Sequence, residues 1–391
     1  MGVFVFLPLV LPLTAWPVAR LAEQHLHPRT ATRLLTVLAV VLALCSTVCL
    51  GLVMVVGTAQ LPGNPLPDGW SDPEVRAAVP YDEVVGKAAI PALCAVVAAC
   101  ARTLWRHARV RRQAHRALTG LPDTEVAVLP DAVPYAYALP GGRRGGSPAD
   151  ARPGGGRTGP PIDGCPGGGR TGPRASARRG GGPAVPHRHG RPGGELTDGG
   201  RTGGGRPGEG ARRGRAGRRA RGPRGGRVVV STALLDRLGA AERRALFAHE
   251  RAHLDARHDR FLLAVQLAAR ANPFLRPLRT AVAYTAERWA DEEAARAIGS
   301  RRTVARAIGT AALVSRGTPV STLAGLAAPG PVPRRVAALL GPAPAVRTWP
   351  PAFTSVGLAA WGAAAGTAVS AMSSANSAVT MVLILHAATP L

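Results

Sequence analysis

Lysine is almost missing from this sequence, and aromatic residues are scarce. Lys87 is the single lysine among 49 basic residues, and aromatic residues make up 4% of the chain. Arginine, alanine, glycine and proline take their place, as is typical of proteins from bacteria with GC-rich genomes. We therefore read the bias as an imprint of the genome rather than as a functional choice.

The five cysteines show no spacing that is typical of a disulfide framework or of a cysteine metal site. Four of them lie in apolar runs, and Cys165 lies in a low-complexity stretch. We interpret those in the apolar runs as small apolar residues of membrane helices. They are Cys45, Cys49, Cys94 and Cys100.

The net charge of +26 comes largely from residues 141–226. This stretch holds 19 arginines against 5 acidic residues, 31 of the 48 glycines, and no aromatic residue. Such a composition cannot bury enough apolar surface to offset the entropy of ordering, so we expect a disordered Gly/Arg/Pro-rich insertion. The overall basicity therefore says little about the rest of the chain.

Apolar segments open and close the chain, and we expect about four transmembrane helices. A signal peptide normally has a basic start and a small-residue cleavage site, and the N-terminus shows neither. Residues 373–391 stay apolar, and the sequence leaves open whether they enter the membrane. The four predicted membrane segments are Val3–Val18, Leu34–Val56, Val84–Trp105 and Ala352–Met372.

Charges in the connecting loops predict the orientation in the plasma membrane. The first loop carries three arginines against one glutamate, and the second, residues 57–83, carries one arginine against five acidic residues. Six arginines follow between Arg102 and Arg116. By the positive-inside rule, the acidic loop 57–83 is extracytoplasmic and residues 106–350 are cytoplasmic.

The cytoplasmic part reads as an α+β domain formed by residues 106–140 and 227–350. Residues 126–129, 135–140 and 227–230 have the composition of short strands. Without residues 141–226, the last two would form a hairpin, so we expect the insertion at a loop tip, where extra length costs little. Helices are predicted at about 241–269, 278–298, 301–315 and 333–340.

The pentapeptide His249-Glu250-Arg251-Ala252-His253 carries the chemistry of this domain. Histidines at i and i+4 project from one face of a helix and can bind one zinc ion, with Glu250 as general base. Glu287, on a second predicted helix, is the natural third ligand, a gluzincin-like set that holds one Zn²⁺ per chain.

Three further residues accompany this predicted metal site. Asp291 lies four residues beyond Glu287, so it can accept the remaining N–H of one zinc-bound histidine. His258 falls off the metal face of a continuous helix, and we interpret it as structural or solvated. Tyr284 and Arg288 are close in sequence, but neither is identifiable as an oxyanion stabiliser.

Together, the "HERAH" and "ERWADEEA" helices and the membrane segments resemble the BlaR/MecR-type integral-membrane zinc metallopeptidases. The segments AYALPG at 136–141 and RVVVSTALL at 227–235 share this similarity. The resemblance implies His249, His253 and Glu287 as zinc ligands, Glu250 as the base and Asp291 as a residue that orients a ligand. It also implies signal transduction, with a cytoplasmic winged-helix repressor as the candidate substrate.

The chain departs from the antibiotic-sensing members of that family. We expect no external penicillin-binding domain, because little chain follows the fourth apolar segment. Such a domain needs a Ser-x-x-Lys nucleophile, but Lys87 is the sole lysine and Val84 occupies the serine position. Acylation by a β-lactam is therefore excluded for this sequence.

Two other functions remain open from the sequence. One is a quality-control protease of the HtpX type, a class that also has an HExxH motif and a glutamate on a later helix. The other is a membrane-tethered binder of nucleic acid through the arginine–glycine tracts of residues 141–226. Such tracts usually interleave aromatic residues for stacking, and these do not, so we expect no direct nucleic-acid partner. The scissile bond, the activating signal and the oligomeric state are not encoded in any pattern that we recognise.

Overall fold

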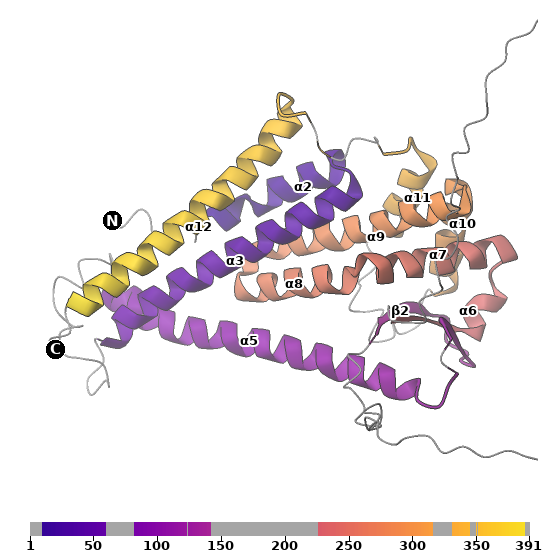
Figure 1. Ribbon diagram of the computed structural model, residues 1–391, viewed down its shortest axis with the longest axis horizontal. Helices are drawn as coiled ribbons and strands as arrows, with labels where there is room; N and C mark the ends of the chain where they lie inside the picture. The colour runs from indigo at the N-terminus through magenta and orange to yellow at the C-terminus, as the bar shows by residue number, and fades with distance from the viewer. Residues whose placement is uncertain are drawn as a thin grey trace, which may run out of the picture. The chain divides into compact units, whose positions relative to one another are not determined.

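The structure, a computed structural model, describes residues 10–59, 82–122, 124–141, 226–315, 331–344, 349 and 351–387. Helices predominate, and one small sheet accompanies them (Figure 1). The first elements are η1 (Leu11–Thr14), α2 (Ala15–His25), α3 (Pro28–Ala59), α5 (Asp82–Ala117), β1 (Val126–Leu129) and β2 (Ala136–Pro140). The remaining ones are β3 (Gly226–Ser231), α6 (Thr232–Asp236), α7 (Ala240–Ala256), α8 (His258–Ala271), η4 (Pro273–Leu275), α9 (Arg276–Ile298), α10 (Arg301–Val314), α11 (Val332–Leu340) and α12 (Ser355–Ala387).

Among the described residues, three helices are long and apolar enough to cross a membrane: α3, α5 and α12. Helices α3 and α5 contain the predicted segments Leu34–Val56 and Val84–Trp105, and α5 continues to Ala117 beyond its apolar part. Helices α3 and α5 approach each other closely at Gly57 and Gly86, where neither backbone leaves room for a side chain.

The other two predicted membrane segments have different outcomes. Helix α12 is longer than the predicted Ala352–Met372, because it runs on as one helix to Ala387 and so includes most of the apolar tail. The first segment, Val3–Val18, lies mostly outside the described residues, and its described part forms η1 and the start of α2. A fourth membrane helix therefore stays a prediction.

The sheet has the strand order β1-β3-β2. Strand β2 pairs antiparallel with β3, and Pro140 lies opposite Gly226, so the hairpin predicted across the insertion is formed. Gly226 has a φ of 122°, and a Cβ there would lie 2.5 Å from the Leu139 carbonyl oxygen, so only glycine fits. Apart from Gly141 and Gly226 themselves, the predicted insertion lies outside the described residues.

The predicted single helix at 241–269 is wrong, because the chain breaks between α7 and α8. Arg257 adopts a left-handed conformation, with φ 55° and ψ 47°, that no α-helix can continue through. Helix α7 begins with the Glu242 carboxylate accepting from the Gly239 N–H at 3.0 Å, and it ends at this break. The other three predicted helices agree with α9, α10 and α11 within about two residues.

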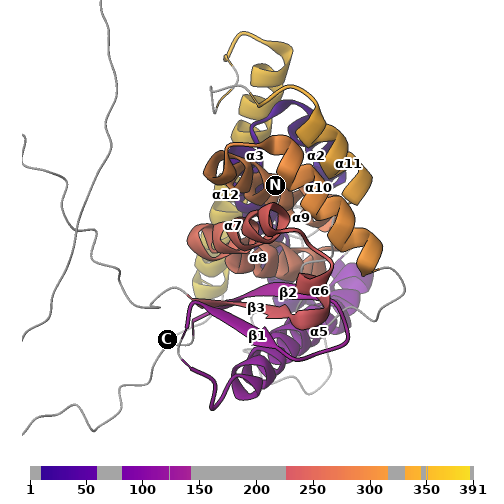
Figure 2. The ribbon, with the colours of Figure 1, turned by 90° about the vertical axis from the view of Figure 1, so that its right-hand side faces the viewer.

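Helix α7 lies between the sheet and the helices α9 and α10 (Figure 2). On its other flank, α9 packs with α8 against the N-terminal half of α3. This contact contains the largest apolar core, in which Leu35, Leu42, Leu275 and Leu278 are almost fully buried. A candidate membrane helix thus forms a common core with the helices that carry the predicted ligands.

Candidate metal centre

The structure brings His249, His253 and Glu287 together, and one ligand atom from each lies within 4.8 Å of the others. The Nε2 atoms of the two histidines are 3.1 Å apart. The carboxylate of Glu287 lies 3.5 Å from His249 Nε2 and 3.4 Å from His253 Nε2. The i, i+4 spacing on α7 aims both rings at α9, and the packing of α7 on α9 supplies the carboxylate.

Asp291 lies on the same face of α9 as Glu287, one turn further along. Its Oδ1 atom is 3.1 Å from Nδ1 of His249, as the i+4 spacing predicts, and its side chain is fully buried. An acceptor at Nδ1 fixes the ring so that the Nε2 lone pair faces the ligand cluster. Asp291 therefore orients one of the candidate ligand histidines and is not itself among the candidate ligands.

Arg335, on α11, binds both acidic residues of α9. Its Nε and Nη2 donate to the two carboxylate oxygens of Asp291 at 2.8 and 2.6 Å, and its Nη1 lies 2.8 Å from Oε2 of Glu287. The arginine is 5% exposed. Burial raises the pKa of the Glu287 carboxyl, but Arg335 and His253 outweigh it and hold that pKa well below its usual range.

His258 turns back toward the cluster because of the break at Arg257. Its Nδ1 lies 2.8 Å from Nδ1 of His253, and its side chain packs edge-on against Trp289. Burial lowers the pKa of His258 to about 2, so the ring is neutral and one of its nitrogens can accept the His253 N–H. The solvated alternative for His258 is therefore wrong, and the structural one is confirmed.

Glu250 is buried beside the cluster and contacts the edge of the sheet. Burial raises its pKa to about 7, with a further contribution from the charge of Glu287, although the charge of His249 and, more weakly, a hydrogen bond from the backbone of Ala138 oppose the shift. Ala138 belongs to β2, which pairs on one side with β3. A carboxyl with a pKa near neutrality takes up and releases protons easily, as general acid–base chemistry requires.

In this buried cluster, the negatively charged groups outnumber the positively charged ones. Three carboxylates, Glu250, Glu287 and Asp291, face the single guanidinium of Arg335, which gives a net charge of −2 when both ligand histidines are neutral. A buried charge of this size is costly unless it is compensated. Protons partly compensate it here: although burial disfavours the charged ring, Asp291 and Glu287 raise the pKa of His249 to about 10.

A divalent cation supplies the same compensation. Two imidazole nitrogens and one carboxylate oxygen are ligands that zinc prefers, and three protein ligands are typical of a catalytic zinc. Each histidine also has a partner at Nδ1, Asp291 for one and His258 for the other, which leaves both Nε2 atoms for a metal. The residues present therefore fit a zinc ion.

Two residues considered from the sequence do not face this cluster. The Tyr284 ring lies under the Arg334 guanidinium, 4.3 Å from its carbon, and Arg288 pairs with Glu292 at 3.0 Å. Sequence reasoning missed Arg335 altogether. It comes from a short helix 44 residues beyond Asp291, and no spacing rule connects the two.

A sequence model of peptidase family M48 matches residues 220–271. The matched stretch contains β3, α6, α7 and α8, and so both α7 histidines and Glu250, but it ends before α9. No curated protein and no solved structure matches the chain. Over the segment that carries the two histidines, the chain is thus similar to peptidase family M48, which is consistent with a membrane zinc metallopeptidase.

Proposed function

We propose that this protein is a membrane-bound zinc endopeptidase that cleaves protein segments in the cytoplasm. The observation that carries the proposal is the buried cluster of His249, His253 and Glu287, whose ligand atoms all lie within 4.8 Å of one another. The similarity of residues 220–271 to peptidase family M48 agrees with this chemistry.

The roles of the residues follow from their positions. Zinc held by the two histidines and Glu287 supplies Lewis-acid chemistry, which polarises a carbonyl group and lowers the pKa of water. Glu250 takes a proton from the attacking water and delivers it to the leaving amine nitrogen. Asp291 and His258 keep the histidine rings oriented throughout, and Arg335 keeps Glu287 and Asp291 ionised.

Strand β2 offers a place for the substrate backbone. It is an edge strand among the described residues, and Ala138 within it contacts Glu250. A peptide that adds to a sheet edge gains main-chain hydrogen bonds regardless of its sequence. We propose that the scissile segment lies extended along β2, with its carbonyl group beside Glu250.

The decisive test of this mechanism is Glu250→Gln, a substitution that preserves size and removes the base. Full-length protein in detergent would be assayed with fluorescently labelled casein, and its zinc would be measured in the same preparation. We expect zinc to be retained and the cleavage rate to fall by about 10²–10⁴-fold. A Glu250→Gln protein that cleaves casein at the normal rate would sink the mechanism.

For the natural substrate, we propose a cytoplasmic winged-helix repressor, on the strength of the resemblance to BlaR/MecR-type peptidases. Co-expression of the full-length protein with the repressor encoded nearest to it would test this choice. Cleavage of that repressor that depends on Glu250 supports signalling. Cleavage of unfolded membrane proteins with the repressor left intact supports quality control instead.

A non-enzymatic role in binding nucleic acid through the arginine-rich insertion makes an opposite prediction. Deleting residues 142–225 joins Gly141 to Gly226 next to a strand pair that already forms. The peptidase proposal expects the shortened protein to keep its zinc and its activity on casein. Loss of function together with salt-sensitive RNA binding of the intact chain would favour the binder.

A further inference from the structure

The turn between α8 and α9 presents a basic surface with an exposed aromatic residue at its tip. The chain has no acidic residue between Asp259 and Glu287. Phe274, in the turn, is 58% exposed. We call this surface the hairpin tip, and it comprises the exposed side chains of Arg270, Phe274, Arg276 and Arg279.

Among the described residues, no carboxylate lies within ion-pair distance of the three arginines of the hairpin tip. Arginines elsewhere in the same domain find partners, as Arg301 does with Glu292 at 2.8 Å and Arg334 with Glu23 at 3.0 Å. The hairpin tip is therefore a concentrated positive surface that a partner from outside the chain can neutralise.

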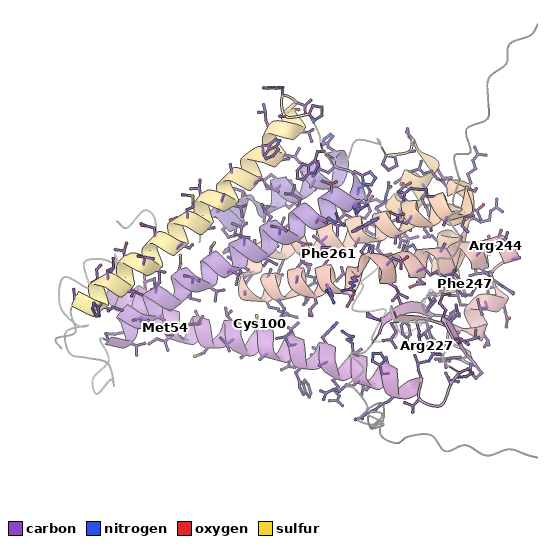
Figure 3. All side chains as sticks on the ribbon, in the orientation of Figure 1. Met54, Cys100, Arg227, Arg244, Phe247 and Phe261 are labelled. Carbon is purple, nitrogen blue, oxygen red and sulfur yellow. The ribbon has the colours of Figure 1, made fainter. Side chains whose placement is uncertain are left out.

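Two contacts fix the height of the hairpin tip along the candidate membrane helices. Asn272 Nδ2 donates to Ser46 Oγ of α3 at 3.0 Å, and both residues are buried. Cys100 Sγ of α5, which is labelled in Figure 3, lies 3.8 Å from the carbonyl oxygen of Leu267 on α8. The turn between α8 and α9 thus contacts α3 at Ser46, and the end of α8 contacts α5 at Cys100.

The character of α5 changes at this same level. From Val84 to Cys100 it carries one charged residue, Lys87, whereas the following turns carry Arg102 and Arg106. Trp105 is 55% exposed, and the Arg109 guanidinium lies 5.4 Å from its ring centre. Tryptophan and arginine side chains of this kind mark the headgroup layer of a membrane.

Below this level, most exposed side chains of the three candidate membrane helices are apolar, with Lys87, Asn376 and His386 as exceptions. Val48 of α3 is 42% exposed, and Val97 of α5 is 59% exposed. The C-terminal part of α12 continues the pattern, since Val379, Val382 and Leu383 are each about as exposed, at 59–63%. On α5 this apolar surface ends near the level of the hairpin tip, whereas on α3 it continues beyond Ser46, since Leu44 and Val37 are each 61% exposed.

We infer that the hairpin tip is a lipid-binding site, in which its three arginines hold the phosphates of anionic lipids of the cytoplasmic leaflet. Phe274 reaches into the layer between headgroups and acyl chains. An arginine near an anionic membrane surface favours anionic over neutral lipid by about fivefold at low salt. The lipid class follows from charge complementarity, because the tip offers donors and no acceptor carboxylate.

This placement also fixes the height of the metal centre, a consequence that rests on the proposed function. Glu287 lies eight residues beyond Arg279 on the continuous helix α9. At 1.5 Å per residue, the rise is about 12 Å. A peptide bond cleaved there lies about 12 Å from the hairpin tip, which is about twice the thickness of one headgroup layer.

A depth measurement tests the site without reference to catalysis. Full-length Phe274→Trp protein would be placed in nanodiscs of mixed phosphatidylcholine and phosphatidylglycerol, with one lipid brominated near the headgroup end of its chains. We expect brominated phosphatidylglycerol to quench the added emission more strongly than brominated phosphatidylcholine. The matched control is Leu313→Trp on α10, a residue 63% exposed, which we expect to stay unquenched.

A second variant tests whether the arginines select the lipid. Replacing Arg270, Arg276 and Arg279 by glutamine in the Phe274→Trp background should equalise quenching by the two brominated lipids. Replacing the exposed Arg302 and Arg306 of α10 should leave the preference unchanged. Absence of quenching at position 274, or equal quenching by both lipids before the arginines are replaced, overturns the inference. Neither result bears on whether the protein is a peptidase.

Discussion

Arg335→Gln removes the buried guanidinium that pairs with both Glu287 and Asp291 in the metal centre. The arginine makes three contacts of 2.6–2.8 Å with these carboxylates and is 5% exposed. Breaking a buried ion pair by removing one partner costs about 3–5 kcal/mol. For a domain of this size, we expect the unfolding temperature of metal-free protein to fall by about 10 °C or more.

Zinc should reduce the destabilisation that Arg335→Gln causes, and the experiment compares this destabilisation with and without zinc. At a thousandfold excess over its Kd, zinc stabilises a folded protein by about 4 kcal/mol. In the variant, the zinc dication also offsets the charge of the carboxylates that have lost Arg335, so we expect Arg335→Gln to be less destabilising with zinc than without it. Unfolding would be followed by intrinsic fluorescence in detergent, with and without zinc.

The neighbouring Arg334 provides the matched control. Arg334 lies on the same helix and pairs with Glu23, but its side chain is 43% exposed. An exposed pair of this kind contributes at most about 1 kcal/mol. If Arg335→Gln destabilises no more than Arg334→Gln, or if zinc leaves its effect unchanged, the account of the buried charge is refuted.

The remaining predictions concern the other partners of the ligands. His258→Leu removes the acceptor at His253 Nδ1 and should weaken zinc binding by about 10–100-fold. His258→Asn should weaken it less. Equal zinc affinities of His258→Leu and the unaltered protein would contradict this role of His258. Zinc uptake at pH 8 should release about one proton, because His249 has a pKa of about 10 without metal and must be neutral to bind it. The apparent zinc affinity should therefore rise with pH up to about 10, and calorimetry in two buffers that detects no proton release would refute this assignment. Gly226→Ala should destabilise the protein by about 1–3 kcal/mol, because an alanine there has an unfavourable φ and clashes with Leu139, and an unchanged unfolding temperature would count against the strand geometry.

The part of the site that could be predicted is the part set by helix periodicity. His249 and His253 share a helix face at i+4, and so do Glu287 and Asp291. Once the two helices are predicted, the relative positions of these four side chains can be predicted as well. The pairing of β2 with β3 was predictable too, since a short apolar run with strand composition borders the insertion on each side. Local regularities of this kind are visible in a single sequence.

His258 and Arg335 could not be predicted because their positions depend on irregular or long-range structure. The break between α7 and α8 occurs at Arg257, and arginine is not a residue that favours the left-handed conformation. Without the break, His258 would point away from His253. Arg335 reaches Asp291 only through the packing of α11 on α9, which depends on the whole intervening chain.

The candidate membrane helices show a different limit of sequence reasoning. Hydropathy located α3, α5 and α12, but it did not predict that the N-terminal half of α3 packs against α8 and α9. An apolar surface reads the same whether lipid or protein covers it. Thr32 of α3 also donates to Thr285 of α9 at 2.9 Å, two residues from Glu287, so a candidate membrane helix directly contacts the helix that carries a candidate ligand.

The zinc content of the purified protein tests the central claim most directly. Full-length protein prepared without chelators would be analysed for metal, together with His249→Ala, Glu287→Gln and His107→Ala, a histidine outside the cluster. We expect about one zinc per chain in the unaltered protein and in His107→Ala, and zinc at background level in the two ligand variants. Unaltered protein without zinc, or a His249→Ala variant that keeps it, would contradict the account.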